Sequence, residues 1–218
     1  MKTGIIIGAS DVVNEDIYHD MQKEKTGDFF LIAADGGLLT CLKYDIDPDF
    51  FVGDMDSSGQ IKPEKIKAVC PKIQIETSSP VKDDTDMALA VKKAVENGCT
   101  KIMIYGGLGG SRPDHSIANI QLMHHYKLEG IDIKMHSGNV DMYCLMDEKK
   151  TFDENEKGYI SFFSLSDESD ITTKGLAYEY DGTLKNSYAL GVSNEFTGKP
   201  AFVEVKKGVI LVVTVKKS

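Results

Sequence analysis

No apolar run in the sequence is long enough to cross a membrane. The N-terminus, MKTGIIIGAS, holds an apolar stretch of only a few residues, which is typical of a buried strand and too short for a signal peptide or a transmembrane helix. We therefore expect a soluble, cytoplasmic protein with no membrane partner.

A surplus of positive charge is also missing. Lys and Arg number 25 against 34 Asp and Glu, so the net charge is −9. Binding to nucleic-acid backbones requires a basic surface, which excludes nucleic acid as a general partner. Most of the negative charge precedes residue 150, and an anionic ligand bound there would need a cation between itself and the protein.

Several catalytic and structural patterns are absent as well. The four cysteines form no Cys-x-x-Cys pair, so we expect reduced, mostly buried thiols and no zinc site. No Ser-His-Asp or Cys-His signature occurs, and no glycine-rich stretch has the Walker pattern. Tryptophan is missing entirely.

Short apolar runs alternate with amphipathic stretches up to about residue 136. Helical spacing is clearest in Asp84–Asn97 and Asp114–Leu128. This alternation favours a mostly parallel sheet covered on both faces. The expected strands are Gly4–Gly8, Phe29–Ala33, Phe50–Val52, Lys72–Glu76, Lys101–Tyr105 and Asp132–Met135.

The pattern changes after about residue 140. Helical periodicity stops, and short alternating runs separated by glycines appear, such as Tyr159–Ser164, Ala201–Val205 and Val209–Val215. These are typical of an antiparallel sandwich or barrel. The sequence thus predicts two domains, an α/β domain over residues 1–140 and a β-domain over 141–218.

Acidic residues follow the ends of two predicted strands, and a third acidic run leads into a predicted helix. Asp35 follows the second, Asp54 and Asp56 follow the third, and Asp86 lies near the start of a helix. Ligands of open parallel sheets bind at the carboxyl ends of the strands. Close acids repel one another, and Mg²⁺ bound to the carboxylates and to phosphate oxygens relieves that repulsion. We therefore assign Asp54, Asp56 and Asp86 as metal ligands. The alternative is a turn stabilised by its own Asp side chains.

The run Lys82–Asp86 also contains candidates for a structural role. Asp83 or Asp84 is suited to cap the following helix, which leaves Asp86 for the metal. Lys82 is a candidate phosphate contact, and an exposed ion-paired lysine is the alternative.

A glycine-rich loop spans Gly106 to His115 between a predicted strand and a helix. Backbone N–H groups at such a position, here including Gly107 and Gly110, can cradle phosphates, and Arg112 can make forked contacts with phosphate oxygens. Asp114 as a helix cap and His115 as a surface imidazole are the alternatives for those two residues.

Taken together, these motifs resemble the thiamine pyrophosphokinase (thiamine diphosphokinase) family. The resemblance covers nearly the whole chain and rests on motifs in the family's order. They are ADGG, PDFFVGDMDSS, KDDTDMALA, GGLGGSRPDHSIANIQLM and GVSNEFTGKPAFVEVKKGVILVV.

The resemblance implies a nucleotide-binding α/β domain followed by a thiamine-binding β-sandwich. It implies diphosphate transfer from MgATP to thiamine, giving thiamine diphosphate and AMP, in a homodimer whose active site lies at the subunit interface. Matched by position, Asp54, Asp56 and Asp86 bind Mg²⁺, and Ser193 and Asn194 contact thiamine. The nucleotide and diphosphate contacts are Asp35, Lys82, Thr85, Arg112 and Asp114.

Some points stay open. Without tryptophan, the ring that stacks on thiamine is Phe196, Tyr178 or Tyr188, and the sequence does not choose among them. One alternative function is diphosphate transfer to another hydroxymethyl acceptor such as a pterin. The other is a catalytically idle nucleotide- or vitamin-binding protein.

Overall fold

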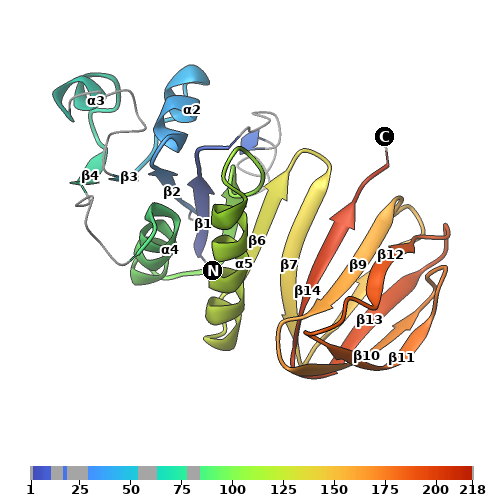
Figure 1. The fold of residues 1–218 in the computed structure, drawn as a ribbon. Coiled ribbons are helices and arrows are strands. Elements are labelled where there is room, and N and C mark those ends of the chain that lie inside the picture. Colours follow the sequence, from blue (N-terminus) through green and yellow to red (C-terminus); the bar gives the residue numbers. More distant parts are fainter. Residues whose placement is uncertain (1, 11–16, 19–28, 54–62, 78–83, 218) are drawn as a thin grey trace. The chain divides into compact units, whose positions relative to one another are not determined.

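The structure is a computed structural model of the chain (Figure 1). It describes residues 2–10, 17–18, 29–53, 63–77 and 84–217. The chain divides into two compact units, one of residues 1–122 and 130–138, the other of residues 123–129 and 139–218. No helix within the described ranges is long and apolar enough to span a membrane.

The first unit contains a parallel sheet with the strand order β6-β5-β1-β2-β3-β4. Every neighbouring pair in this order is parallel. Its central strands are almost fully buried, as expected for parallel strands covered on both faces. The strands are β1 (Lys2–Ile7), β2 (Phe29–Ala34), β3 (Phe50–Gly53), β4 (Gln74–Thr77), β5 (Cys99–Tyr105) and β6 (Asp132–Ser137).

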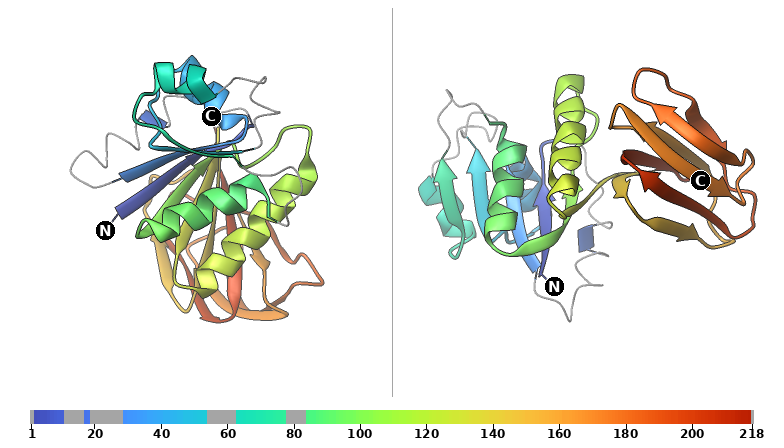
Figure 2. Two further views of the ribbon diagram at one scale, coloured as in Figure 1. Left: turned by 90° about the vertical axis from the view of Figure 1, so that its left-hand side faces the viewer. Right: turned by 90° about the horizontal axis from the view of Figure 1, so that it is seen from below.

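Helices cover both faces of this sheet. On one face, α2 (Gly37–Lys43) and α3 (Pro63–Val69) share a core with alternate residues of the strands, including Ile5 and Ile7. The other face carries α4 (Asp86–Glu96) and α5 (Pro113–Leu128), which cross in front of the strands in the left view of Figure 2. Because successive side chains of a strand point to opposite faces of the sheet, alternate residues of β1 pack on opposite faces.

The start of α4 is fixed by Thr85. Thr85 has an extended backbone, and its Oγ1 accepts the N–H of Ala88 at 3.1 Å. Such a side-chain cap contributes about 1 kcal/mol. The cap is therefore Thr85, one position after the expected Asp84, and Asp83 lies outside the described residues.

The second unit is a sandwich of two antiparallel sheets. One has the order β12-β9-β14-β7 and the other β11-β10-β13-β8. Both inner faces contribute to one apolar core, for example Phe162 and Val212 from the first sheet and Ile171 and Val203 from the second. The strands are β7 (Val140–Met146), β8 (Lys149–Phe152), β9 (Tyr159–Ser164), β10 (Glu168–Lys174), β11 (Tyr180–Lys185), β12 (Gly191–Glu195), β13 (Ala201–Lys207) and β14 (Val209–Val215).

The predicted fold class, a parallel α/β half followed by an antiparallel β half, is confirmed. Two strands, β9 and β14, have the predicted bounds, whereas β4 begins two residues later than predicted. All four cysteines are buried and none forms a disulfide, as expected.

Candidate active site

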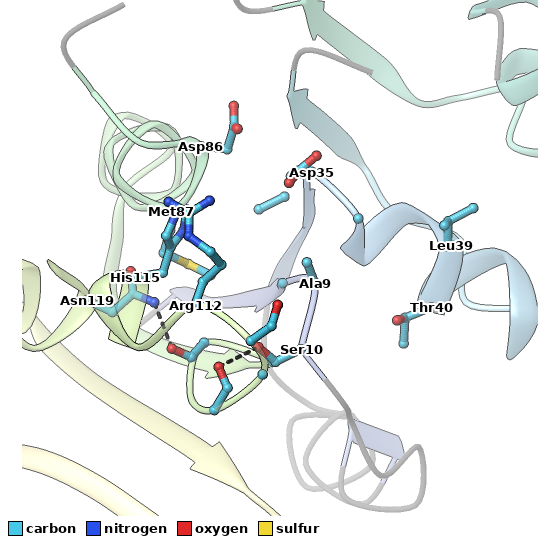
Figure 3. A pocket seen from close by; sticks show the side chains of 18 residues that line it. Ala9, Ser10, Asp35, Leu39, Thr40, Asp86, Met87, Arg112, His115 and Asn119 are labelled. Carbon is cyan, nitrogen blue, oxygen red and sulfur yellow. Dashed lines mark hydrogen bonds between the residues drawn. The ribbon is translucent and has the colours of Figure 1, made fainter. Parts of the chain in front are cut away.

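A pocket of about 540 Å³ lies at the carboxyl ends of the parallel strands. Strand β1 has β2 on one side and β5 on the other. Strands β2 to β4 therefore extend the sheet on one side of β1, and β5 and β6 extend it on the other. Ligands of open parallel sheets bind at such a switch point. We call this the sheet-edge pocket (Figure 3). It is lined by Gly8, Ala9, Ser10, Ala34, Asp35, Gly36, Leu39, Thr40, Asp86, Met87, Gly106, Gly107, Gly109, Gly110, Ser111, Arg112, His115 and Asn119.

The glycine-rich loop packs directly against the end of β1. The N–H of Gly8 donates to the carbonyl of Tyr105 at 2.7 Å, and the N–H of Ser10 donates to the carbonyl of Gly106 at 3.2 Å. Gly106 has a φ of 68°, and a Cβ there would lie 2.7 Å from the carbonyl oxygen of Gly8. Glycine alone fits this position, so the path of the loop along the pocket depends on it.

Side chains of α5 and of the segment that follows β1 hold the rest of the loop. Asn119, which is 5% exposed, donates from Nδ2 to the carbonyl of Gly107 at 2.7 Å, the bond drawn in Figure 3. The Oγ of Ser116 accepts the N–H of Gly109 at 3.1 Å, and Ser10 donates from Oγ to the carbonyl of Gly109 at 3.4 Å. These hydrogen bonds fix the path of the loop along the pocket.

Arg112 is the only arginine in the sequence, and it lines the pocket. Its guanidinium donates from Nη2 to Oδ2 of Asp114 at 2.7 Å and from Nε to Oδ1 at 3.0 Å. These side-chain hydrogen bonds raise the pKa of Arg112 and lower the pKa of Asp114. The pair is exposed, so it orients the cation while adding little to stability.

Two carboxylates reach the pocket from neighbouring elements. Asp35 follows β2 with a φ of 50°, and its N–H donates to the carbonyl of Val52 at 2.8 Å. Asp86 is the first residue of α4. Figure 3 shows both side chains on the same side of the pocket. A positive φ at a non-glycine residue is uncommon and costs backbone strain, and such residues cluster at functional sites.

The predicted metal ligands are only partly within the described chain. Asp54, Asp56 and Lys82 lie outside the described residues. Among the residues that are described, no group of three or more His, Cys, Asp or Glu side chains forms a metal site. Asp86 is the one predicted ligand whose position the structure gives.

A second pocket, of about 210 Å³, lies in the β-sandwich unit. We call it the sandwich pocket. Asn194 lines it, whereas the exposed neighbour Ser193 has a φ of 61° at a register shift in β12. Its lining is mostly apolar and aromatic and consists of Phe162, Ile171, Thr173, Tyr178, Glu179, Tyr180, Leu184, Leu190, Gly191, Val192 and Asn194.

The sequence profile of the thiamin pyrophosphokinase catalytic domain matches residues 5–135, and that of the vitamin B1 binding domain of the same enzymes matches residues 149–210. The chain belongs to the thiamine pyrophosphokinase family. This confirms the predicted family and activity: the chain carries both domains of a thiamine diphosphokinase. Enzymes of this family bind thiamine and use ATP as the co-substrate.

Individual relatives agree with this assignment. Thiamine pyrophosphokinase of Bacillus subtilis (strain 168) is 28% identical over 186 residues, which cover 84% of this chain and 85% of that protein. The crystal structure of a Bacillus subtilis thiamine pyrophosphokinase superposes with a TM-score of 0.83 at 23% identity, over 100% of both chains. That of Candida albicans gives 0.77 at 14% identity, over 98% of this chain and 90% of the other. These similarities support the two-part fold.

The sheet-edge pocket brings together many of the residues predicted from the sequence. Those that line it are Asp35, Asp86, Gly107, Gly110, Arg112 and His115. Asp114 contacts Arg112, and Thr85 precedes Asp86 as the helix cap. Sequence reasoning missed Ser10 and Asn119. The Gly-Ala-Ser run after the first strand points to Ser10 only once β1 is known to lie at the switch point.

Proposed function

We propose that this member of the family transfers the diphosphate group of MgATP to the hydroxyethyl oxygen of thiamine, in the cytoplasm. The observation that carries the proposal is the sheet-edge pocket. It combines an ordered glycine-rich loop, the only arginine of the chain and two carboxylates at a switch point. That set of groups suits a nucleotide phosphate chain bridged to acids by a cation.

In this proposal the loop and Arg112 bind the phosphates. The N–H groups of Gly107 and Gly110 face anionic oxygens, and the guanidinium of Arg112 is kept at the pocket by Asp114. A fork of N–H donors matches phosphate geometry. Thr85 and His115 lie next to the same region, and we propose them, with Lys82, as further nucleotide contacts.

The carboxylates fit Mg²⁺, because hard oxygen ligands are what this ion binds. Asp35 and Asp86 already lie on one side of the pocket. Strand β3 ends at Gly53, where a Cβ would lie 3.1 Å from Cα of Asp35, so the chain passes beside Asp35 just before Asp54 and Asp56. We propose that Asp54, Asp56 and Asp86 hold the ion, which would neutralise charge on the phosphates.

The reaction balances as a single displacement. The thiamine hydroxyl oxygen forms a bond to the β-phosphorus of ATP and loses its proton, and the bond from that phosphorus to the α,β-bridging oxygen breaks. AMP leaves with the electron pair. The protein's part in such a transfer is positioning and charge stabilisation.

The experiment is incubation with MgATP and, in separate arms, thiamine, a hydroxymethylpterin or no acceptor. We expect AMP release only with thiamine. Release only with the pterin would favour the alternative acceptor, and release in no arm, despite measurable nucleotide binding, would favour an idle binding protein.

We also propose a homodimer in which the sheet-edge pocket of one subunit and the sandwich unit of the other complete each active site. The division of chemistry between the two units supports a site that draws on both: charged groups line one pocket, and apolar and aromatic groups line the other. The sharing across subunits is what the resemblance to the family implies. Mixing an Asp54→Asn protein with a protein carrying Ser193→Ala and Asn194→Ala tests it. Activity should return after subunit exchange, and a mixture that stays inactive despite proven exchange contradicts sharing.

A further inference from the structure

Four consecutive peptide units of the glycine-rich loop are each held by one hydrogen bond from outside the loop. In the first unit, the carbonyl of Gly106 accepts from the N–H of Ser10 at 3.2 Å. In the second, the carbonyl of Gly107 accepts from Nδ2 of Asn119 at 2.7 Å (Figure 3). Because a peptide group is planar, each bond sets the direction of a whole peptide plane.

The next two peptide units are held at Gly109. Its N–H donates to Oγ of Ser116 at 3.1 Å, and its carbonyl accepts from Oγ of Ser10 at 3.4 Å. Ser116 and Asn119 are three residues apart in α5 and therefore share one face of that helix. The segment after β1 and one face of α5 thus hold the loop together.

These bonds leave two backbone N–H groups of the loop unused. In a trans peptide the N–H points opposite to the carbonyl of the same unit, and the described residues contain no cis peptide bond. The N–H of Gly107 therefore points away from Ser10, and the N–H of Gly110 points opposite to the carbonyl of Gly109. Neither donates a hydrogen bond within the described part of the chain. Both glycines line the sheet-edge pocket, so two oriented donors are available there to an anion.

Asn119 makes the shortest of the four bonds, and it makes it in a buried place. Both Asn119 and Gly107 are buried. A Cβ at Gly107 would lie 2.7 Å from Cγ2 of Ile104 and 3.3 Å from Sδ of Met135, so the loop is packed closely onto the sheet at this residue. A buried carbonyl that loses its donor must find another. Without the amide of Asn119, the peptide plane would therefore turn, and the N–H groups next to it would turn with it.

Ser116 acts on the loop from outside the pocket. Its hydroxyl holds the N–H of Gly109, but Ser116 is not among the residues that line the sheet-edge pocket. Asn119, by contrast, lines the pocket itself. An effect of Ser116 on a bound nucleotide must therefore pass through the loop, whereas Asn119 is also placed for direct contact.

We propose that Asn119 and Ser116 are positioning residues for phosphate binding. They hold the loop so that the N–H groups of Gly107 and Gly110 are directed at the oxygens of the nucleotide. This inference rests on the proposed function and deepens it, because it names two residues that act on the nucleotide through the loop.

The test measures binding of Mg²⁺ with a non-hydrolysable ATP analogue by calorimetry, and steady-state kinetics, for full-length variants. Asn119→Ala should raise the Kd of the analogue about tenfold, and Ser116→Ala about threefold. Because donors that bind phosphate also stabilise charge in the transition state, kcat should fall as well, while the KM for thiamine is unchanged. The double variant should lose less than the product of the two single effects, since both act through one loop.

Asn119→Asp separates loss of the donor from loss of packing. An ionised carboxylate cannot donate to the carbonyl of Gly107, but a protonated one can, and burial raises the pKa of a carboxyl. The Kd of this variant should therefore approach the wild-type value as pH falls from about 8 to about 5. The ratio for Asn119→Ala should stay constant. Comparison with wild type at each pH removes the effect of the other titrating groups.

Ser169→Ala is the matched control. Ser169 is fully buried and also donates to a backbone carbonyl, that of Val209 at 3.0 Å, but in the sandwich unit. Its loss should lower the Tm and leave the Kd of the analogue unchanged. An equal rise of Kd in Ser169→Ala would show a general effect of stability and overturn the inference.

The remaining outcomes separate this inference from the proposed function. If wild type binds the analogue but releases no AMP with thiamine, the proposed function fails, while the binding measurements still decide the inference. An unchanged Kd in Ser116→Ala overturns it, and this half-buried position decides the matter even if Asn119→Ala does not fold. A double variant that loses the full product of the single effects would assign Asn119 to direct ligand contact, which also overturns it.

Discussion

The carboxylate of Asp114 accepts two hydrogen bonds from the guanidinium of Arg112, 2.7 Å from Nη2 and 3.0 Å from Nε. The two residues flank Pro113, the first residue of α5. The side chains of Arg112 and Asp114 therefore join the end of the glycine-rich loop to the start of the helix. Because both side chains are exposed, the ion pair orients the guanidinium of Arg112 but contributes little to folding stability.

Arg112→Ala should therefore impair the use of MgATP selectively. Loss of a charged hydrogen-bonding partner predicts a KM for MgATP raised about tenfold to a hundredfold, with the KM for thiamine unchanged. Arg112→Lys keeps the charge but loses the forked donor geometry, so its KM for MgATP should lie between those of wild type and Arg112→Ala. Steady-state kinetics with each substrate varied in turn decides the point, and equal damage to both KM values would count against a phosphate role.

Replacement of Asp86 tests the metal assignment. Asp86→Asn removes a charge with almost no change in shape, so the fold should persist while turnover falls by roughly a hundredfold at limiting Mg²⁺. Asp84→Asn is the control, because Asp84 is close in sequence but does not line the pocket. The same result is expected for Asp54→Asn and Asp56→Asn.

The measurement for these variants is rate against Mg²⁺ concentration, with thermal unfolding recorded alongside. Near-normal rates for Asp86→Asn at low Mg²⁺ would show that Asp86 does not bind the metal ion. A fall of the same size in Asp84→Asn would point to a general effect of charge.

Gly106→Ala should disrupt the loop more than its backbone conformation alone explains. Both Gly106 and Gly130 have positive φ, at 68° and 78°, but a Cβ at Gly106 would lie 2.7 Å from the carbonyl oxygen of Gly8, whereas one at Gly130 has nothing within 4 Å. Gly130→Ala should thus cost about 1 kcal/mol of conformational strain. Gly106→Ala adds a clash with backbone, so its free energy of unfolding and its MgATP affinity should fall further. Chemical denaturation of both variants tests this. Equal losses of unfolding free energy in Gly106→Ala and Gly130→Ala would contradict the close approach of Gly106 to the carbonyl of Gly8.

The buried thiols predict a dependence on alkaline pH. Burial raises the pKa of Cys41 from an ordinary 9.0 to about 12 and that of Cys70 to about 11. A pKa raised in the folded state gives stability that is complete below the unfolded value and is lost as pH rises toward the folded value. The free energy of unfolding should therefore fall above about pH 9. A Cys41→Ala, Cys70→Ala protein, with its lower starting stability, should show a shallower decline, and an identical slope would contradict this cause.

The sequence predicted elements well where hydrophobic periodicity and glycine marked them. Strands such as Val209–Val215 have the predicted bounds because apolar side chains alternate without interruption. The strand order was less accessible, since pairing of β1 with β5 depends on contacts between residues about a hundred positions apart. For that reason the switch point, and with it Ser10, was not found.

Side-chain roles in the sites depended on similar long-range geometry. Arg112 was recognisable because it lies in a glycine-rich loop at the start of a helix, where anions bind. Asp86 was recognisable because the acids before it were expected to cap that helix, which left Asp86 for another role. Asn119 was not, because a polar residue on a helix becomes informative only when its partner, the carbonyl of Gly107, is known. The hydrogen bonds between Asn194 and Tyr178 likewise follow from a bulge that no local pattern announces.

The most direct test of the central claim is the stoichiometry of a single reaction followed by phosphorus NMR. Protein, MgATP and thiamine are combined, and the products are counted. We expect one AMP and one thiamine diphosphate for each ATP consumed, with no ADP and no free diphosphate. Formation of ADP with thiamine monophosphate, or consumption of ATP that does not depend on thiamine, would contradict it.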